Sequence, residues 1–182
     1  MEKRLVMLAI LIFNCVCLFG QFGAYKKGFV VLNNGDTLRG FVKDDVQEVN
    51  SKKVFFKNPT GSKKLFYACD IRSFQREKDH YIKGIVDSVN NDAIQGLLKV
   101  MSDGKCKLLK YKSLSLMSGG GMDSGYSPKI YYYILTPEGL LIRVFSRDYQ
   151  QLIDKYYSDR KVRGKKYRFG NIESDFLELN SL

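Results

Sequence analysis

The side chains best suited to nucleophilic catalysis gather in one short segment of the chain. Cys69 and Ser73 are candidate nucleophiles, and Asp70 or Asp79 could orient a general base. A nucleophile of this kind needs an adjacent base, and the chain's one histidine, His80, would have to supply it. No nucleophile elbow or cysteine-protease motif surrounds these residues, and a surface histidine at a strand start also explains His80. The sequence therefore predicts no enzyme and no catalytic residue, with a His80-based hydrolase as the least favoured alternative.

Motifs for phosphate cofactors and metals are also incomplete. The run Gly119-Gly120-Gly121 is followed by Met122-Asp123, whereas a P-loop needs Lys and then Ser or Thr at the start of a helix. Cys69 and Cys106, with Asp70 or His80, show no recognisable zinc-ligand spacing. We therefore expect neither a cofactor nor a metal.

The strongest local concentration of charge is the run RKVRGKKYR from residue 160 to residue 168. Such a cluster binds phosphates or sulfates without specificity, although charge runs are more often solvated connectors. Both interpretations stay open. The candidate polyanion-binding residues are Arg160, Lys161, Arg163, Lys165, Lys166 and Arg168.

The whole chain of 182 residues is basic, with a formal net charge of +11. This balance favours anionic partners such as nucleic acid, lipid headgroups or acidic polysaccharide, although many exported proteins are simply basic. If the chain is exported, nucleic acid is the least natural of these three partners.

The first twenty residues have the layout of a secretory signal peptide. Lys3 and Arg4 precede an apolar run from Leu5 to Phe19, which ends at Gly20-Gln21. The run is short for a membrane span, which needs about 20 residues; an uncleaved N-terminal anchor is the alternative. We expect residues 1–20 to be removed, leaving no transmembrane span, and residues 21–182 to form a single domain in the periplasm or at the cell surface.

Two of the four cysteines, Cys69 and Cys106, lie outside the predicted signal peptide. In an oxidising compartment they are a candidate disulfide, but two cysteines do not make a disulfide framework. The alternative is a pair of buried thiols that act as small apolar residues.

Strand patterns dominate from about residue 28 to residue 145. Turn residues separate the apolar segments, among them Asn34-Gly35, for which a type I′ turn is predicted, and Asp103-Gly104. In Tyr131-Tyr132-Tyr133, alternation puts the outer two rings on one face of a strand and the middle ring on the other. The predicted strands are 29–32, 37–43, 53–57, 64–68, 80–86, 97–101, 105–111, 130–135 and 140–145.

Helix patterns follow the strands. Tyr149, Leu152, Ile153 and Tyr156 have amphipathic spacing in a helix at about 147–157 that Ser146 would cap. A second helix is predicted at about 171–180. Strands followed by helices predict an α+β, mainly β domain, whose antiparallel hairpins form a sheet or a partly open barrel with two C-terminal helices.

The segment between Ser113 and Ser127 is rich in Ser and Gly and is predicted to be a long loop. The hairpins resemble one another only loosely, so no internal repeat is predicted.

Short motifs along residues 25–180 resemble a group of uncharacterised exported proteins from Bacteroidetes-type bacteria. These proteins combine a signal peptide ending in Gln, a Gly-aromatic-Val segment, a Gly-Asp-Thr hairpin, a β-rich domain and C-terminal helices. The corresponding motifs here are Gly28-Phe29-Val30, Gly35-Asp36-Thr37, Val54-Phe55-Phe56, Tyr67 with Asp70, Ile71 and Phe74, and Tyr131-Tyr132-Tyr133. The resemblance implies the fold and the export of the chain, and it carries over no catalytic residue, ligand or cofactor.

The sequence therefore predicts an exported, non-catalytic protein of the cell envelope. Its expected partner is an anionic envelope polymer bound through the 160–168 run. The alternative is a protein–protein adaptor that pairs with an envelope protein through a sheet edge.

Overall fold

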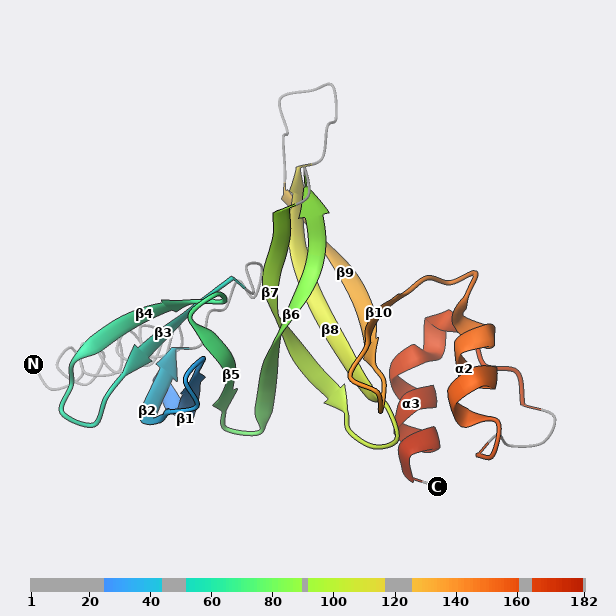
Figure 1. The fold of residues 1–182 in the computed structure, drawn as a ribbon, viewed down its shortest axis with the longest axis horizontal. Coiled ribbons are helices and arrows are strands. Elements are labelled where there is room, and N and C mark those ends of the chain that lie inside the picture. Colours follow the sequence, from blue (N-terminus) through green and yellow to red (C-terminus); the bar gives the residue numbers. More distant parts are fainter. Residues whose placement is uncertain (1–24, 44–51, 90–91, 117–125, 161–164, 182) are drawn as a thin grey trace, which may run out of the picture.

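The computed structural model describes residues 25–43, 52–89, 92–116, 126–160 and 165–181. The predicted signal peptide lies outside these residues. The described chain is α+β and mainly β, as predicted, and its ten antiparallel strands form one open sheet (Figure 1).

The strands follow the order β10-β9-β8-β7-β6-β5-β1-β2-β3-β4 across the sheet. Consecutive strands are neighbours except at one place, where the chain leaves β4 at one edge and returns to pair β5 with β1. The strands are β1 (Tyr25–Leu32), β2 (Thr37–Lys43), β3 (Lys53–Lys57), β4 (Lys63–Tyr67), β5 (Ile71–Arg76), β6 (Asp79–Val89), β7 (Asp92–Ser102), β8 (Lys107–Leu116), β9 (Tyr126–Leu135) and β10 (Leu141–Val144).

Three local predictions about the strands are wrong. β5 was not predicted. Its pairing with β1 has a register shift at Val31/Leu32, and this irregularity breaks the alternation of side chains that marks a strand in the sequence. β8 and β9 pair from Lys107↔Leu135 to Leu116↔Tyr126, so both strands enter the predicted Ser/Gly loop. The connection between β7 and β8 spans residues 103–106 instead of two residues.

The turn at Asn34-Gly35 also differs from the predicted type I′ turn. Leu32 C=O accepts the Gly35 N–H at 3.0 Å, so Asn33 and Asn34 are the central residues of the turn. Gly35 has φ of 97°, but Asn34 is not in the left-handed region. The loop is therefore a four-residue turn that closes on a left-handed glycine.

Two helices follow the strands, as predicted. They are α2 (Tyr149–Tyr157) and α3 (Ile172–Ser181), and a short 3₁₀ segment, η1 (Phe169–Asn171), directly precedes α3. The predicted stripes are on the buried side, with Tyr149 and Ile153 on α2 and Phe176 on α3 almost fully buried. The predicted Ser146 cap is wrong, because the N-cap is Asp148 and its side chain makes no capping hydrogen bond.

Contrary to expectation, the chain contains an internal repeat. Residues 25–43 align without gaps with residues 81–99 and are identical at eight of the nineteen positions. The register matches too, because Gly28 faces Gly40 in the β1–β2 hairpin and Gly84 faces Gly96 in the β6–β7 hairpin. We call β1–β5 the first unit and β6–β10 the second unit.

Each unit curls around its own core over its facing glycines. A Cβ on Gly40 would lie 2.7 Å from the Phe56 ring, and one on Gly96 would lie 2.7 Å from the Tyr111 ring. The glycines therefore let an aromatic ring cross directly over the backbone. The inner side of the first unit buries Val30, Val42, Val54, Phe56, Phe66 and Phe74, and that of the second buries Val86, Leu98, Leu109, Tyr111 and Tyr133.

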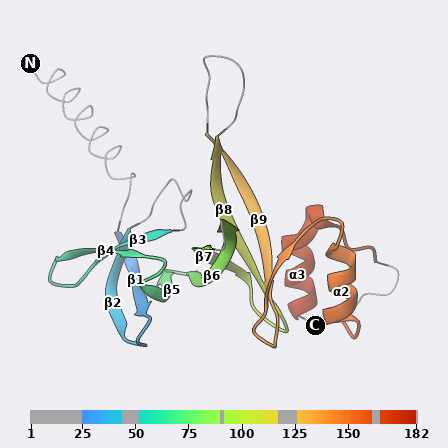
Figure 2. The same cartoon turned by 45° about the horizontal axis from the view of Figure 1, so that its top comes forward.

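The two units curl toward opposite faces of the continuous sheet. Ile82 pairs with Ser73 on the outer side of the first unit and with Leu98 on the inner side of the second. The outer side of one unit thus continues into the inner side of the other. In Figures 1 and 2 the first unit and the helices lie at opposite ends of the molecule.

The helices cover the outer side of the second unit only. α2 and α3 pack on Cys106, Leu108, Ile134 and Val144, which form one buried cluster with the helix residues. No helix among the described residues is long and apolar enough to span a bilayer.

Candidate functional site

The outer side of the first unit carries a concentration of basic and aromatic side chains. Val30, Val42 and Phe56 point inward, so residues next to them along each strand point outward, because side chains alternate across a strand. We call this outer surface the basic face. Its residues are Tyr25, Lys27 and Phe29 on β1, Arg39, Phe41 and Lys43 on β2, Lys53, Phe55 and Lys57 on β3, and Lys63, Leu65 and Tyr67 on β4.

Cations and apolar groups alternate along β1, β2 and β3 of the basic face. On β3, for example, Phe55 lies between Lys53 and Lys57. The cations are exposed apart from Lys57, which is half-buried, and the aromatic rings are half-buried apart from Tyr67, which is 53% exposed. Among the described residues, six basic residues and no acidic residue therefore belong to this surface.

Aromatic rings hold several of these cations close together. The ammonium groups of Lys43 and Lys53 lie 5.4 Å and 5.6 Å from the centroid of the Phe55 ring, and the Arg39 guanidinium lies 5.9 Å from that of Phe29. Such cation–π contacts favour each cation by about 0.5–1 kcal/mol at exposed sites. Two like charges therefore gather around one ring.

Lys57 and Lys63 are direct cross-strand partners in the β3–β4 ladder. Like charges at such a position are destabilising. None of the six cations of the basic face forms an ion pair within the part of the chain that the structure describes. The repulsion between Lys57 and Lys63 is therefore not compensated there.

The second unit contains a matching pair of facing lysines, but there the charges are compensated. Lys99 and Lys110 are partners in the β7–β8 ladder. Lys99 pairs with Asp79 at 2.8 Å, and Lys110 pairs with Glu173 of α3 at 2.8 Å. Glu173 also accepts a 2.6 Å hydrogen bond from the Tyr132 hydroxyl. The hydrogen bonds from Lys110 and Tyr132 lower the pKa of Glu173.

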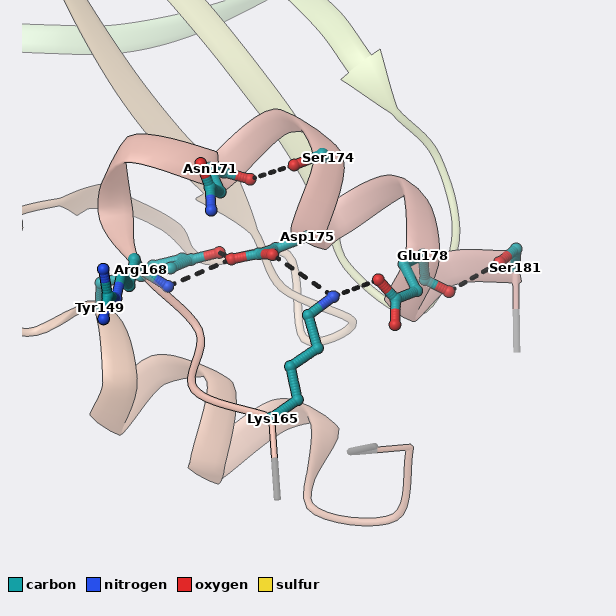
Figure 3. Close-up of polar contacts among 8 residues, drawn as sticks. All are labelled: Tyr149, Lys165, Arg168, Asn171, Ser174, Asp175, Glu178 and Ser181. Atoms are coloured by element: carbon teal, nitrogen blue, oxygen red, sulfur yellow. Dashed lines mark hydrogen bonds and ion pairs between the residues drawn. The ribbon is translucent and has the colours of Figure 1, made fainter. Parts of the chain in front are cut away.

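The predicted 160–168 cluster is partly committed to structural contacts, and Lys161 and Arg163 lie outside the described residues. The Arg160 side chain donates to the Leu179 carbonyl at 3.4 Å. Lys165 pairs with Glu178 and lies 3.7 Å from Asp175 (Figure 3). The hydrogen bond to Glu178 raises the pKa of Lys165. The side chains of Lys166 and Arg168 are exposed.

Asp175 anchors this connector to both helices. It is 3% exposed and accepts hydrogen bonds from the Tyr149 hydroxyl at 3.1 Å and from the Arg168 backbone N–H at 3.3 Å. Burial raises the pKa of Tyr149, and the carboxylate of Asp175 raises it further. The contacts of Asp175 and Lys165 drawn in Figure 3 therefore have a structural role, which is to join α2, the connector and α3.

A cavity of about 110 Å³ opens on the inner side of the second unit. The Arg143 guanidinium lies in it, 4.3 Å from the centroid of the Tyr131 ring. The Tyr133 hydroxyl, also at the cavity, donates to the Val86 carbonyl at 2.6 Å, and burial raises the pKa of Tyr133 to about 12. The remaining lining residues are Lys52, Val86, Asp87, Ile94, Tyr111 and Ser113.

The structure does not join the predicted catalytic groups. His80 faces Gln75 in the β5–β6 ladder, and no hydrogen bond among the described residues links it to Ser73 or Cys69. Asp79 is engaged by Arg76 at 3.1 Å and Lys99 at 2.8 Å. Burial lowers the pKa of His80, and Lys107 lowers it further. No group of three His, Cys, Asp or Glu residues in the described ranges could hold a metal ion.

The two cysteines of the candidate disulfide are free thiols in separate units. Cys69 is exposed in the turn between β4 and β5, and its thiol lies 3.6 Å from Asp70 Oδ1. Cys106 is buried under the helices, where burial raises the pKa of its thiol. Its backbone N–H donates to the Tyr157 hydroxyl at 3.1 Å.

No known protein family, curated protein or solved structure matches the chain. The evidence for the candidate site is therefore the geometry and chemistry of its own residues.

Proposed function

We propose that the chain is an exported, non-catalytic protein that binds an anionic component of the cell envelope through the basic face. The observation that carries this proposal is the set of six cations with no ion pair among the described residues, two of which, Lys57 and Lys63, face each other directly. An anionic partner would remove the repulsion between these lysines. The apolar run at residues 5–19 supports export.

The basic face supports this function better than the 160–168 connector does. Lys165 already has two carboxylate neighbours, Glu178 and Asp175, and Arg160 contacts a helix carbonyl. Exposed cations held near aromatic rings can approach a partner without breaking an existing ion pair. We therefore assign polyanion binding to the first unit and regard the connector as mainly structural.

The test is elution from an immobilised sulfated polysaccharide in a salt gradient. The variant Lys57→Gln/Lys63→Gln removes two cations of the basic face. The matched control Lys105→Gln/Lys107→Gln removes two lysines that already pair with Asp159 and Asp103. We expect the first variant to elute at clearly lower salt and the control to elute close to the parent chain, because binding through several cations falls steeply with salt.

Equal shifts of the two variants would mean that only net charge matters, and the assignment to the basic face would fail. A third variant, Lys165→Gln/Lys166→Gln, tests the connector in the same gradient. A larger shift for this variant than for Lys57→Gln/Lys63→Gln would return the function to the 160–168 run.

A further inference from the structure

We propose that the anionic component is a lipid bilayer, and that the basic face binds its surface peripherally. This inference rests on the proposed function and names the partner of the same site. Three apolar side chains, Phe41, Phe55 and Leu65, lie on three neighbouring strands of the face, and cations flank Phe41 and Phe55 along their own strands. Apolar groups that reach the headgroup boundary beneath a rim of Lys and Arg are the ordinary composition of a peripheral membrane surface.

The cations are spread over two dimensions. β1 and β4 each contribute one, Lys27 and Lys63, and β2 and β3 contribute two each. Since neighbouring strands are about 4.8 Å apart, the charges cover a patch about 15 Å wide. A single polymer strand would follow one line of cations, whereas a charged surface meets the whole patch at once.

The shape of the basic face supports the same partner. The first unit curls around the cluster that contains Val30 and Phe56, so its outer side is convex. Phe55 lies on this side, between Lys53 and Lys57 along β3. A convex side brings its outward-pointing residues first to a soft and nearly flat bilayer.

The composition also argues against a protein partner. Protein–protein interfaces are depleted in lysine, and five of the six cations of the basic face are lysines: Lys27, Lys43, Lys53, Lys57 and Lys63. An anionic bilayer attracts each basic residue near its surface enough to change partitioning about fivefold. The side chains also bring apolar stems that lie along the neighbouring rings.

The experiment is sedimentation with vesicles of phosphatidylcholine and phosphatidylglycerol (3:1), with pure phosphatidylcholine as the neutral reference. The chain used starts at residue 21, because the apolar run 5–19 would bind lipid by itself; this chain keeps every described strand, helix and core cluster. The variants are Lys57→Gln/Lys63→Gln, the control Lys105→Gln/Lys107→Gln, and Phe55→Ala. Thermal unfolding of each confirms that it is folded.

We expect binding to the anionic vesicles only. Lys57→Gln/Lys63→Gln should weaken it about 20-fold, while the control changes it less than about twofold. Phe55→Ala should weaken binding to the anionic vesicles about fivefold, because a half-buried ring loses apolar contact.

Two results overturn this inference in distinguishable ways. If the polysaccharide is bound through Lys57 and Lys63 but the anionic vesicles are not, the lipid assignment is wrong and the proposed function stands. If neither ligand is bound, both are wrong.

Discussion

The two units share a hairpin sequence and a pair of facing glycines, but their outer sides differ in what lies over them. In the second unit the outer pair Leu108–Ile134 is apolar and buried under α2 and α3. In the first unit the corresponding strands β3 and β4 present Lys53–Tyr67 and Lys57–Lys63. The same framework therefore supports a side covered by helices in one unit and, in the other, a charged side that no described element covers.

Lysine partners show the same difference. In and around the second unit, Lys99, Lys105, Lys107 and Lys110 each have a carboxylate within 2.6–2.8 Å. In the first unit, the six cations of the basic face have none among the described residues. The density of positive charge in the sequence is therefore a poor guide to an anion-binding surface, because some of the lysines already form ion pairs with carboxylates of the same chain.

The first prediction tests whether the two units depend on the same close approach of the chain to their glycines. A Cβ on Gly28 would lie 2.0 Å from the Gln75 carbonyl oxygen, and one on Gly96 would lie 2.7 Å from the Tyr111 ring. Because backbone cannot rotate away, Gly28→Ala should cost about 3 kcal/mol of unfolding free energy, and Gly96→Ala somewhat less. Urea unfolding measures both.

Gly170→Ala is the matched control for these two variants. Nothing lies within 4 Å of a Cβ at Gly170. The unfolding free energy of the Gly170→Ala variant should therefore differ from that of the parent chain by less than about 0.5 kcal/mol. If Gly28→Ala were as mild as Gly170→Ala, the close approach in the first unit would not be real.

The next prediction compares the side covered by the helices with the basic face, by replacing one Phe with Ala on each. Phe176 is fully buried between α3 and the second unit, so Phe176→Ala should cost about 3–5 kcal/mol. Phe55→Ala on the basic face should cost less than about 1.5 kcal/mol, because the ring is already half-exposed. Losses of similar size in chemical denaturation would show that something covers the basic face in the free protein.

A smaller effect concerns the ion pair between α3 and the second unit. The hydrogen bonds from Lys110 and Tyr132 lower the pKa of Glu173 below its usual value of 4.5. The stability that Glu173 contributes is therefore complete above pH 4.5 and is lost as the pH falls through the lowered pKa. Since this side chain is 37% exposed, the contribution should be below about 1 kcal/mol.

Glu173→Gln isolates this contribution. The stability difference between the parent chain and the variant should be largest near pH 6 and should shrink below pH 4.5. A difference that stays constant down to pH 3 would mean that the carboxylate of Glu173 is not the stabilising group.

The smallest change in stability is expected when one charge is reversed in each unit. Lys63→Glu would place a carboxylate opposite Lys57 and should stabilise the protein by about 0.2–1 kcal/mol. Lys110→Glu would instead place a carboxylate beside Glu173 and should destabilise it. The same sign for both changes would remove the contrast between the two units.

Much of the fold could be predicted from local patterns. Alternation and turn residues located most strands, and the helical stripes at Tyr149 and Ile172 are on the buried side as expected. β5 was missed because its irregular register breaks the alternation. The internal repeat was missed because the hairpins were compared only loosely, although Gly28, Gly40, Gly84 and Gly96 mark it at equal spacing.

The basic face was harder to predict than the fold. Its residues come from four strands, so no short window of sequence contains the cluster, whereas the 160–168 run is visible as one block. The alternation of Lys with Phe on β3 was a usable sign. The ladder register, which places Lys57 against Lys63, needed the structure.

The central claim is that the first unit, and not the connector or the second unit, meets the anion. Acylation of lysines by a water-soluble reagent, read residue by residue by mass spectrometry, tests it most directly. The sulfated polysaccharide used for elution would be added at increasing concentrations. We expect Lys53, Lys57 and Lys63 to react readily alone and to become protected with the ligand, while Lys105 and Lys107 keep their rates. Protection confined to Lys165 and Lys166, or equal protection of all lysines, would contradict the account.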